Sequence, residues 1–282
     1  MKTNPFIVVL GIMQDGGYPH IGVSEKKQKK HFKDSKIKEK ISCLGVVDPM
    51  EQQCFLIDAT PHMPYQLDKV LDSSKSSLSG ILVTHTHWGH IGGFGWLSKE
   101  GYNYGGFDVF SSSKNIKIIQ NYFKLFEFKK NISFKAIEDK SDFRLSKNIR
   151  IKAISVPHRA KGDTFGYLVS GEKSIGYFPD CDNIQNWKSR FLKILREVDV
   201  LYLDGTFWDD SEIQNRNLKS IPHPLVKNLI EEFEFLGQET RKKVKFIHMN
   251  HTNPLLDEES LEHKRLKKSG FDIAVEGDVV FL

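Results

Sequence analysis

The sequence predicts an α/β (α+β) fold that forms a single domain over residues 1–282. Short apolar runs typical of strands alternate with segments of helical apolar spacing from Phe6 to Phe281. No linker-like segment interrupts this succession. With 282 residues, of which 39% are apolar, the chain is long enough to bury a substantial core. We therefore expect the strands and helices of both halves to pack together.

Strands are expected where a short β-rich run ends at turn residues, and helices where apolar residues recur three and four positions apart. The first strand is followed by a glycine-assisted loop at 14–20. In the first half the expected strands are 6–10, 42–47, 54–58, 80–83 and 107–110, and the expected helices are 62–71, 91–97 and 115–128.

The second half continues the same alternation of strands and helices. Two strands on either side of 170–172 are expected to form a hairpin, and a second hairpin, of 273–275 with 279–281, is expected to close the chain. The expected strands are 149–156, 163–169, 173–178, 200–206, 243–247, 273–275 and 279–281, and the expected helices are 186–198, 225–236 and 256–268.

Three histidines, His85, His87 and His90, lie within six residues directly after the buried run 80–83. Loops at strand ends are where an α/β sheet usually carries its chemistry. Imidazoles two positions apart on an extended chain project to the same side, and neutral imidazole is a common ligand of zinc-like metals. The spacing favours a metal site over three unrelated loop histidines.

This loop resembles the His-x-His-x-Asp-His signature of the metallo-β-lactamase fold superfamily at every position but one. Gly89 stands where the superfamily has its aspartate. The resemblance implies a four-layer αββα sandwich of two mixed β-sheets with flanking helices and a metal site at one edge. In the superfamily the aspartate and the third histidine serve a second metal, so the second site lacks one ligand unless another carboxylate, such as Asp15, replaces it.

Other segments resemble the branch of this superfamily that contains pyrroloquinoline quinone biosynthesis protein B and related metal-dependent phosphodiesterases. The loop at 14–20 is similar to the one after that branch's first strand, but the cysteine cluster that often follows is absent, so no structural zinc is expected there. The resemblance implies the metal ligands His85, His87, His90, His158, Asp180 and His248, with Asp15, Asp58 and His251 as supporting residues or substitute ligands.

Several of these assignments have rivals in the sequence. Asp182 competes with Asp180 as the bridging carboxylate, and His251 competes with His248 as the last ligand. Asp58 either holds the histidine loop by hydrogen bonds or belongs to a turn before a helix. His223 either donates a proton or hydrogen bond to the substrate or caps a helix.

The expected function is that of a metal-dependent hydrolase with Asp180 and His223 as its catalytic residues. Zinc, as one or two ions, would lower the pKa of bound water and supply hydroxide for attack on a phosphodiester, another phosphate-bearing substrate or an ester. Iron and manganese are the alternative metals. The alternative functions are an iron-dependent oxygenase, which resemblance to the quinone biosynthesis protein implies, and a metal-binding relative without catalysis.

Charge and composition limit the partners. Of the modest net charge of +5, much lies between Glu25 and Lys40, where eight lysines accompany three acids. This run could attract a phosphate-bearing or nucleic-acid partner, but a solvated loop is favoured because Phe32 is its one aromatic residue. A small-molecule or phosphodiester substrate is therefore expected, and a homodimer is left open.

The sequence contains no stretch that looks like a membrane or export signal. No stretch approaches the length of a membrane-spanning helix, and the N-terminal residues lead into a strand instead of a signal sequence. The three cysteines have no CxxC spacing and an odd count, which suits a reducing compartment. We expect a cytoplasmic protein without a membrane partner.

Overall fold

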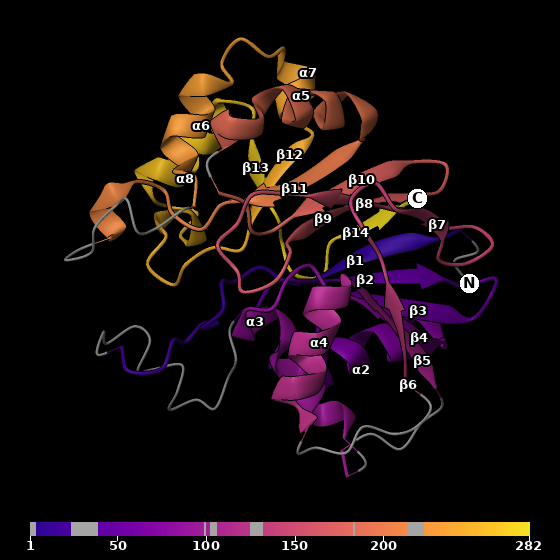
Figure 1. Cartoon of the computed structure of the whole chain (residues 1–282). Coiled ribbons are helices and arrows are strands. Elements are labelled where there is room, and N and C mark those ends of the chain that lie inside the picture. Colours follow the sequence, from indigo (N-terminus) through magenta and orange to yellow (C-terminus); the bar gives the residue numbers. More distant parts are fainter. Residues whose placement is uncertain are drawn as a thin grey trace.

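The computed structural model describes residues 4–23, 39–98, 100–101, 106–124, 132–182, 184–213 and 223–282. Within these residues, two seven-stranded mixed β-sheets pack between helices (Figure 1). The predicted αββα sandwich of two mixed sheets with flanking helices is confirmed. The lysine-rich run after Glu25 lies outside the described residues except for Glu39 and Lys40.

The first sheet has the strand order β14-β1-β2-β3-β4-β5-β6. Its first three junctions, from β14 to β3, are antiparallel, and the rest, from β3 to β6, are parallel. The strands are β1 (Phe6–Gly11), β2 (Cys43–Asp48), β3 (Gln53–Ile57), β4 (Ser77–Leu82), β5 (Phe107–Ser111), β6 (Ile132–Ala136) and β14 (Val279–Phe281).

The second sheet repeats this plan in the order β13-β12-β11-β10-β9-β8-β7. The strands from β7 to β10 pair antiparallel, which includes the expected β9–β10 hairpin, and those from β10 to β13 pair parallel. The strands are β7 (Asp142–Arg144), β8 (Arg150–Ser155), β9 (Phe165–Ser170), β10 (Ser174–Phe178), β11 (Val200–Asp204), β12 (Val244–Ile247) and β13 (Asp272–Ile273).

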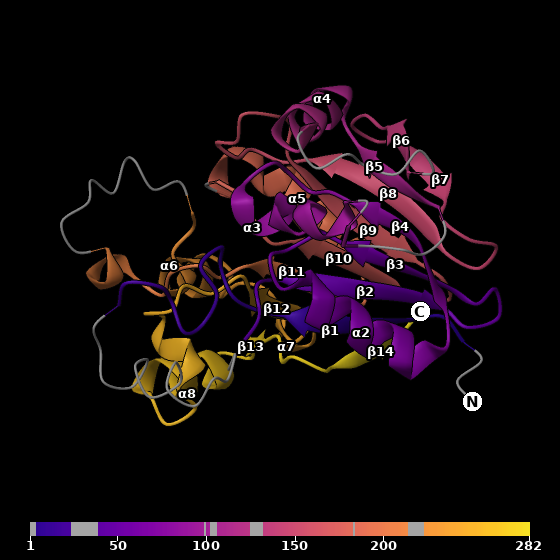
Figure 2. The ribbon, with the colours of Figure 1, turned by 90° about the horizontal axis from the view of Figure 1, so that it is seen from below.

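Helices cover the outer faces of both sheets. Seen from below, α2 and α4 lie over the strands of the first sheet (Figure 2), and α5 to α8 lie beyond the second sheet (Figure 1). The helices are α2 (Met63–Ser74), α3 (Trp88–Ile91), α4 (Ser113–Tyr122), α5 (Lys188–Glu197), α6 (Val226–Glu232), α7 (Gln238–Arg241) and α8 (Leu261–Lys268). No helix in the described ranges is both long enough and apolar enough to cross a membrane.

Strand alternation divides the core into two clusters. In β1, Ile7 and Val9 belong to the cluster between the sheets, whereas Val8 and Leu10 belong to the cluster beneath α2 and α4. Successive side chains of a strand point to opposite faces, so a strand that is apolar on both faces is covered on both. The continuous apolar run 6–10 therefore reflects a strand in an inner layer.

The predicted closing hairpin is wrong, because its two strands lie in different sheets. β13 pairs parallel with β12 in the second sheet, and β14 pairs antiparallel with β1 in the first. The segment between them crosses from one sheet to the other: Ala274 N donates to Phe246 O, and Gly277 N donates to Val9 O. The polar residues at 276–278 thus form a crossover and not a two-strand turn.

Some helix boundaries also differ from the prediction. The helix expected at 91–97 begins earlier, as α3 at Trp88, and then becomes a 3-10 helix over Gly92–Leu97. Gly93 N donates a hydrogen bond to Ala59 O, which lies outside the helix. This bond holds the 3-10 segment next to the loop that follows β3. The helix expected at 256–268 begins at Leu261 because Ser260 caps it. Residues 125–128 of the helix expected at 115–128 lie outside the described residues.

Candidate metal centre

The candidate site lies where parallel strands of both sheets end. β3 and β4 are parallel neighbours in the first sheet, as are β10, β11 and β12 in the second. Their carboxyl ends release the loops that carry the polar residues of the site, which is the usual position of chemistry in α/β sheets. The strand-end residues are Asp58, His85, His87, His90, Asp180, Asp204 and His248.

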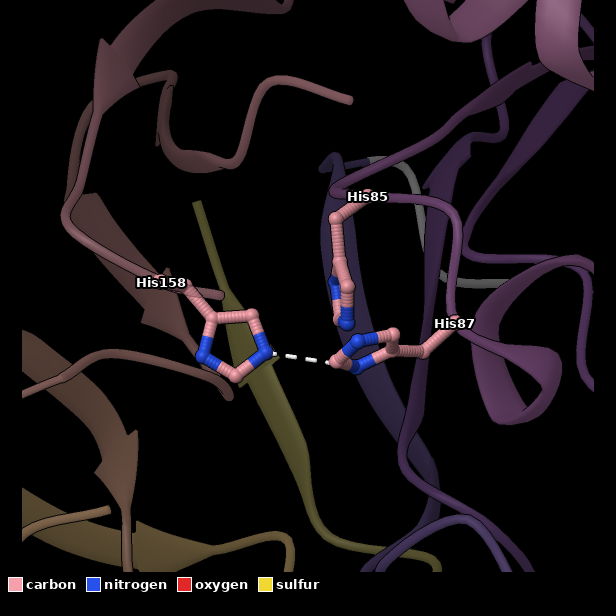
Figure 3. Close-up of side chains that lie close together, drawn as sticks. All are labelled: His85, His87 and His158. Atoms are coloured by element: carbon pink, nitrogen blue, oxygen red, sulfur yellow. Dashed lines mark hydrogen bonds between the residues drawn. The ribbon is translucent and has the colours of Figure 1, made fainter. Parts of the chain in front are cut away.

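The first group of possible metal ligands contains side chains from loops of both sheets. His85 and His87 follow β4, and His158 follows β8 (Figure 3). One donor atom from each ring lies within 4.8 Å of the other two, and His158 Nε2 is 3.2 Å from His87 Nδ1. Such a triple of imidazoles matches the protein ligands of a catalytic zinc site.

Asp180 lies between this group and a second one. Its Oδ2 is 2.9 Å from His90 Nε2 and 3.1 Å from His248 Nε2. Its Oδ1 is 3.5 Å from His158 Nε2. Because the two oxygens face different histidines, the carboxylate has the placement of a bridging group between two ion positions.

The second group brings Asp15 to the histidine loop. Asp15 Oδ1 is 3.5 Å from His90 Nε2 and 3.9 Å from His248 Nε2. The three donor atoms lie within 4.8 Å of one another. Asp15 therefore lies beside the position at which Gly89 leaves a ligand missing.

Asp58 holds the histidine loop in place by accepting hydrogen bonds from it. Its Oδ2 accepts a 2.7 Å hydrogen bond from His90 Nδ1, and its Oδ1 accepts one of 2.8 Å from Thr84 N. Helix α2 has His62 at its N-cap, so Asp58 does not cap it. Asp58 is fully buried and has φ +74°, an uncommon conformation for a residue other than glycine.

Hydrogen-bond partners fix which ring nitrogen faces the site. His87 Nε2 donates to Arg159 O at 3.2 Å, which leaves Nδ1 for a metal. His158 Nδ1 donates to Asp182 Oδ1 at 3.0 Å, which leaves Nε2. Since carbonyl and carboxylate oxygens only accept, each partner determines the tautomer. Asp182 thus lies behind His158 and not between the ion positions.

Several donor atoms at the centre have no hydrogen-bond partner. Among the described residues, buried polar atoms without one include Asp15 Oδ1, His85 Nε2 and Asp180 Oδ2. Buried polar atoms are nearly always paired, so a cluster of unpaired ones calls for an explanation. A cation among them would satisfy these lone pairs, and the imidazole and carboxylate donors fit zinc or iron.

Burial prepares two of the imidazoles for metal binding. It lowers the pKa of His85 well below its ordinary value, and the positive charge of His90 lowers it further. Burial also lowers the pKa of His248. Neutral imidazole is the form that binds metals. Burial raises the pKa of Asp180, but His248 and His85 outweigh it and hold that pKa well below its usual value.

Asp204 is a site residue that the sequence-based assignment missed. It is fully buried at the end of β11, and its Oδ2 accepts a 2.8 Å hydrogen bond from His223 Nδ1. Burial lowers the pKa of His223, but the charge of Asp204 outweighs it and raises that pKa to about 9. Helix α6 has Leu225 at its N-cap, so His223 does not cap it. The signal was present, since Asp204 ends its strand as Asp58 and Asp180 follow theirs.

His251 lies apart from the candidate ligands. Its ring packs against that of His20 in a tilted arrangement, with centroids 4.4 Å apart, and it belongs to none of the donor groups found in the described residues. Both rings line a cavity of about 840 Å³, whose wall also includes Asp15 and His223. This volume is within the range of small-molecule sites. The cavity therefore connects the candidate metal centre to a place where a substrate could bind.

The chain is similar in sequence to a family of known proteins. The family model described as "Beta-lactamase superfamily domain" matches residues 53–262. Coenzyme PQQ synthesis protein B from Pseudomonas protegens is 32% identical over 129 residues, which is 43% of this chain and 43% of that protein. The protein of the same name from Nitrosococcus oceani is 31% identical over 137 residues, 45% of this chain and 43% of that one. The matched segment thus spans less than half of these relatives.

Solved structures share the fold over nearly the whole chain. Zn²⁺-bound PqqB from Methylobacterium extorquens has a TM-score of 0.80 and 18% identity, covering 98% of this chain and 100% of that one. A diphosphatase from the PhnP family has a TM-score of 0.70 and 19% identity, covering 99% and 97%. At these identities the likeness is one of fold.

Proposed function

Because this chain belongs to the beta-lactamase superfamily domain family, we propose that it is a metal-dependent hydrolase acting on a phosphodiester or another ester. One observation carries the proposal. Unpaired donor atoms of both sheets, His85 Nε2 and Asp180 Oδ2 among them, converge beside a cavity that can hold a small molecule. Buried lone pairs in this arrangement favour a metal, and the adjoining space favours a substrate.

The ligands of the first position are His85, His87, His158 and Asp180. A metal bound there would lower the pKa of coordinated water towards neutrality and polarise an oxygen of the substrate. Burial lowers the pKa of His85 and of His87 and keeps both imidazoles neutral, and Asp180 stays ionised, so these three donors are ready for a cation at neutral pH. We propose zinc as the metal, with iron and manganese as the alternatives.

His223 is the proposed proton donor. Asp204 accepts the hydrogen on Nδ1, which leaves Nε2 as the nitrogen for the substrate, and the ring borders the cavity. With its pKa raised to about 9, the ring is protonated at neutral pH. It can therefore pass the proton on Nε2 to the leaving-group oxygen as that bond breaks.

The cavity wall supports a small substrate whose charge is concentrated at the scissile group. Its described lining includes the acids Asp15 and Glu212 and the aromatic residues Trp88 and Phe207, and it contains neither lysine nor arginine. An anionic phosphoryl group would therefore be neutralised by the metal centre and by the protonated ring of His223. The remote part of the substrate is expected to be neutral.

Turnover of bis(4-nitrophenyl) phosphate by the full chain tests this proposal. Protein stripped with a chelator is expected to be inactive, and zinc is expected to restore release of 4-nitrophenol. His85→Ala should stay inactive at the same zinc concentration. Equal turnover by the stripped protein, or by His85→Ala, would rule out a metal-dependent phosphodiesterase at this site.

A second candidate function is iron-dependent oxygenation. The similarity to coenzyme PQQ synthesis protein B favours it, because histidine and carboxylate ligands bind iron as well as zinc. Oxygen uptake by the iron-loaded protein, together with inactivity of the zinc form on phosphodiesters, would favour this candidate. Tight metal binding with neither activity would favour a non-catalytic relative.

A further inference from the structure

We propose that Asp15 is the carboxylate ligand of the second metal position, which it forms with His90, His248 and Asp180. This inference rests on the proposed metal-dependent function but concerns metal binding, which can be measured without any substrate. It assigns a ligand to a loop that follows β1, about seventy residues before the histidine loop in the sequence. Five observations support it.

The donor atoms surround one space. His90 Nε2 and His248 Nε2 are 3.3 Å apart, and each lies near Asp180 Oδ2, at 2.9 and 3.1 Å. Asp15 Oδ1 lies 3.5 Å from the first nitrogen and 3.9 Å from the second. Two imidazoles and two carboxylates in this arrangement are a suitable donor set for zinc.

The two imidazoles are oriented with their outer nitrogens occupied. His90 Nδ1 donates to Asp58 Oδ2. His248 Nδ1 donates to the hydroxyl of Thr206, which itself donates to Asp204 Oδ1 at 2.7 Å. Both Nε2 atoms are therefore directed inwards, as is typical of ligating histidines with a hydrogen-bond partner behind them.

Asp15 has a buried oxygen that a metal would satisfy in this arrangement. Its Oδ1 is buried and has no hydrogen-bond partner within the described ranges. The surrounding donors at this position are ring nitrogens and the Asp180 carboxylate, and carboxylate oxygens repel one another unless a cation or proton lies between them. A shared cation accounts for the close approach of Asp15 and Asp180 to the same pair of rings.

Gly89 explains how Asp15 reaches the site. A Cβ atom at residue 89 would lie 2.1 Å from Asp15 Oδ1 and 2.8 Å from Asp15 Cα. Because one of these contacts is to the backbone, a change of side-chain rotamer at Asp15 would not relieve it. Asp15 thus occupies the space that any side chain at residue 89 would need.

The base of the Asp15 loop is fixed close to the site. Gln14 N donates to Met249 O at 2.9 Å, and Met249 N donates to Ile12 O at 2.8 Å. The loop is thereby held against the residue that follows His248. Farther along, Gly16 and His20 line the cavity, so the proposed ligand and part of the substrate wall belong to one segment.

Calorimetric titration of chelator-stripped full-length protein with zinc alone tests this inference. Wild type is expected to bind two zinc ions. Asp15→Ala should keep the first and bind the second at least about 100-fold more weakly, since even supporting residues contribute 10–100-fold. Gly89→Ala should have the same selective effect, because its methyl group would displace Asp15 although it removes no donor.

Two matched variants serve as controls. Gly237→Ala adds the same methyl group where no atom lies within 4 Å, and Glu212→Gln changes another acid of the cavity wall. Both should bind two zinc ions with wild-type affinity. Retention of the first zinc shows that Asp15→Ala and Gly89→Ala are folded. A single zinc in wild type, wild-type affinity in Asp15→Ala, or equal losses in the controls would overturn the inference, whatever the protein hydrolyses.

Discussion

Asp204 Oδ2 accepts a 2.8 Å hydrogen bond from His223 Nδ1, while Oδ1 of the same carboxylate accepts from the hydroxyl of Thr206. That hydroxyl lies 3.0 Å from His248 Nδ1. One buried carboxylate therefore orients both the proposed proton donor and, through Thr206, a candidate metal ligand. It is the last residue of β11 and is not among the residues that line the cavity.

Asp204→Asn is expected to lower kcat about 10²- to 10⁴-fold, the usual contribution of general acid catalysis, because it removes the charge that keeps His223 protonated. Steady-state phosphodiesterase assays would measure this loss. The kcat of His223→Gln should fall by a similar factor, and the kcat of the double variant should be only slightly lower than that of either single variant. Asp199→Asn, which alters a carboxylate bonded to Ser174 N, is the control. Fully additive losses would show that Asp204 and His223 act separately.

His85→Ala is expected to abolish metal binding at the first position, because its Nε2 is buried within the donor cluster and has no other partner among the described residues. His251→Ala should bind metal as wild type does, since the His251 ring packs against His20 in the cavity wall. Metal analysis by mass spectrometry after dialysis would compare them. Equal metal loss in the two variants would contradict the ligand assignment.

Stability should depend on pH through Glu212. Burial raises the pKa of this carboxyl from 4.5 to about 7, so the folded state holds the proton more tightly than the unfolded state. Its stabilising contribution is therefore complete below pH 4.5 and is lost as the pH rises through 7. Urea unfolding of metal-free protein at pH 5 and pH 8 should show a larger fall in the free energy of unfolding for wild type than for Glu212→Gln, which cannot titrate. Equal falls would mean that Glu212 ionises normally.

Much of the fold could be predicted because apolar runs and turn residues in the sequence correspond to buried strands and to the turns between neighbouring strands. The apolar run 6–10 is a strand covered on both faces, and the turn at 170–172 joins neighbouring antiparallel strands. The closing strands could not be paired from the sequence. The turn residues at 276–278 suit a hairpin as well as a crossover, and only the partners of Val9 and Phe246 decide between them.

Some residues of the candidate site could likewise be predicted from the sequence, and others could not. The close spacing of His85, His87 and His90 indicates a metal site, and the resemblance to the superfamily adds the strand-end residues Asp58 and Asp180. The pairing of Asp204 with His223 depends on how a strand end and a distant loop meet, which spacing does not encode. Asp15 could be named from the sequence as a candidate to replace the ligand missing at Gly89, but the steric contact between the two residues lies across two loops and needed the structure.

The most direct test of a metal centre at this cluster is anomalous scattering from crystals of the full chain, measured at the zinc and iron absorption edges. We expect a peak within bonding distance of His85, His87, His158 and Asp180, at whichever edge the bound metal absorbs. Crystals grown with added zinc that show no peak at either edge beside Asp180 would contradict the assignment of this cluster as a metal centre.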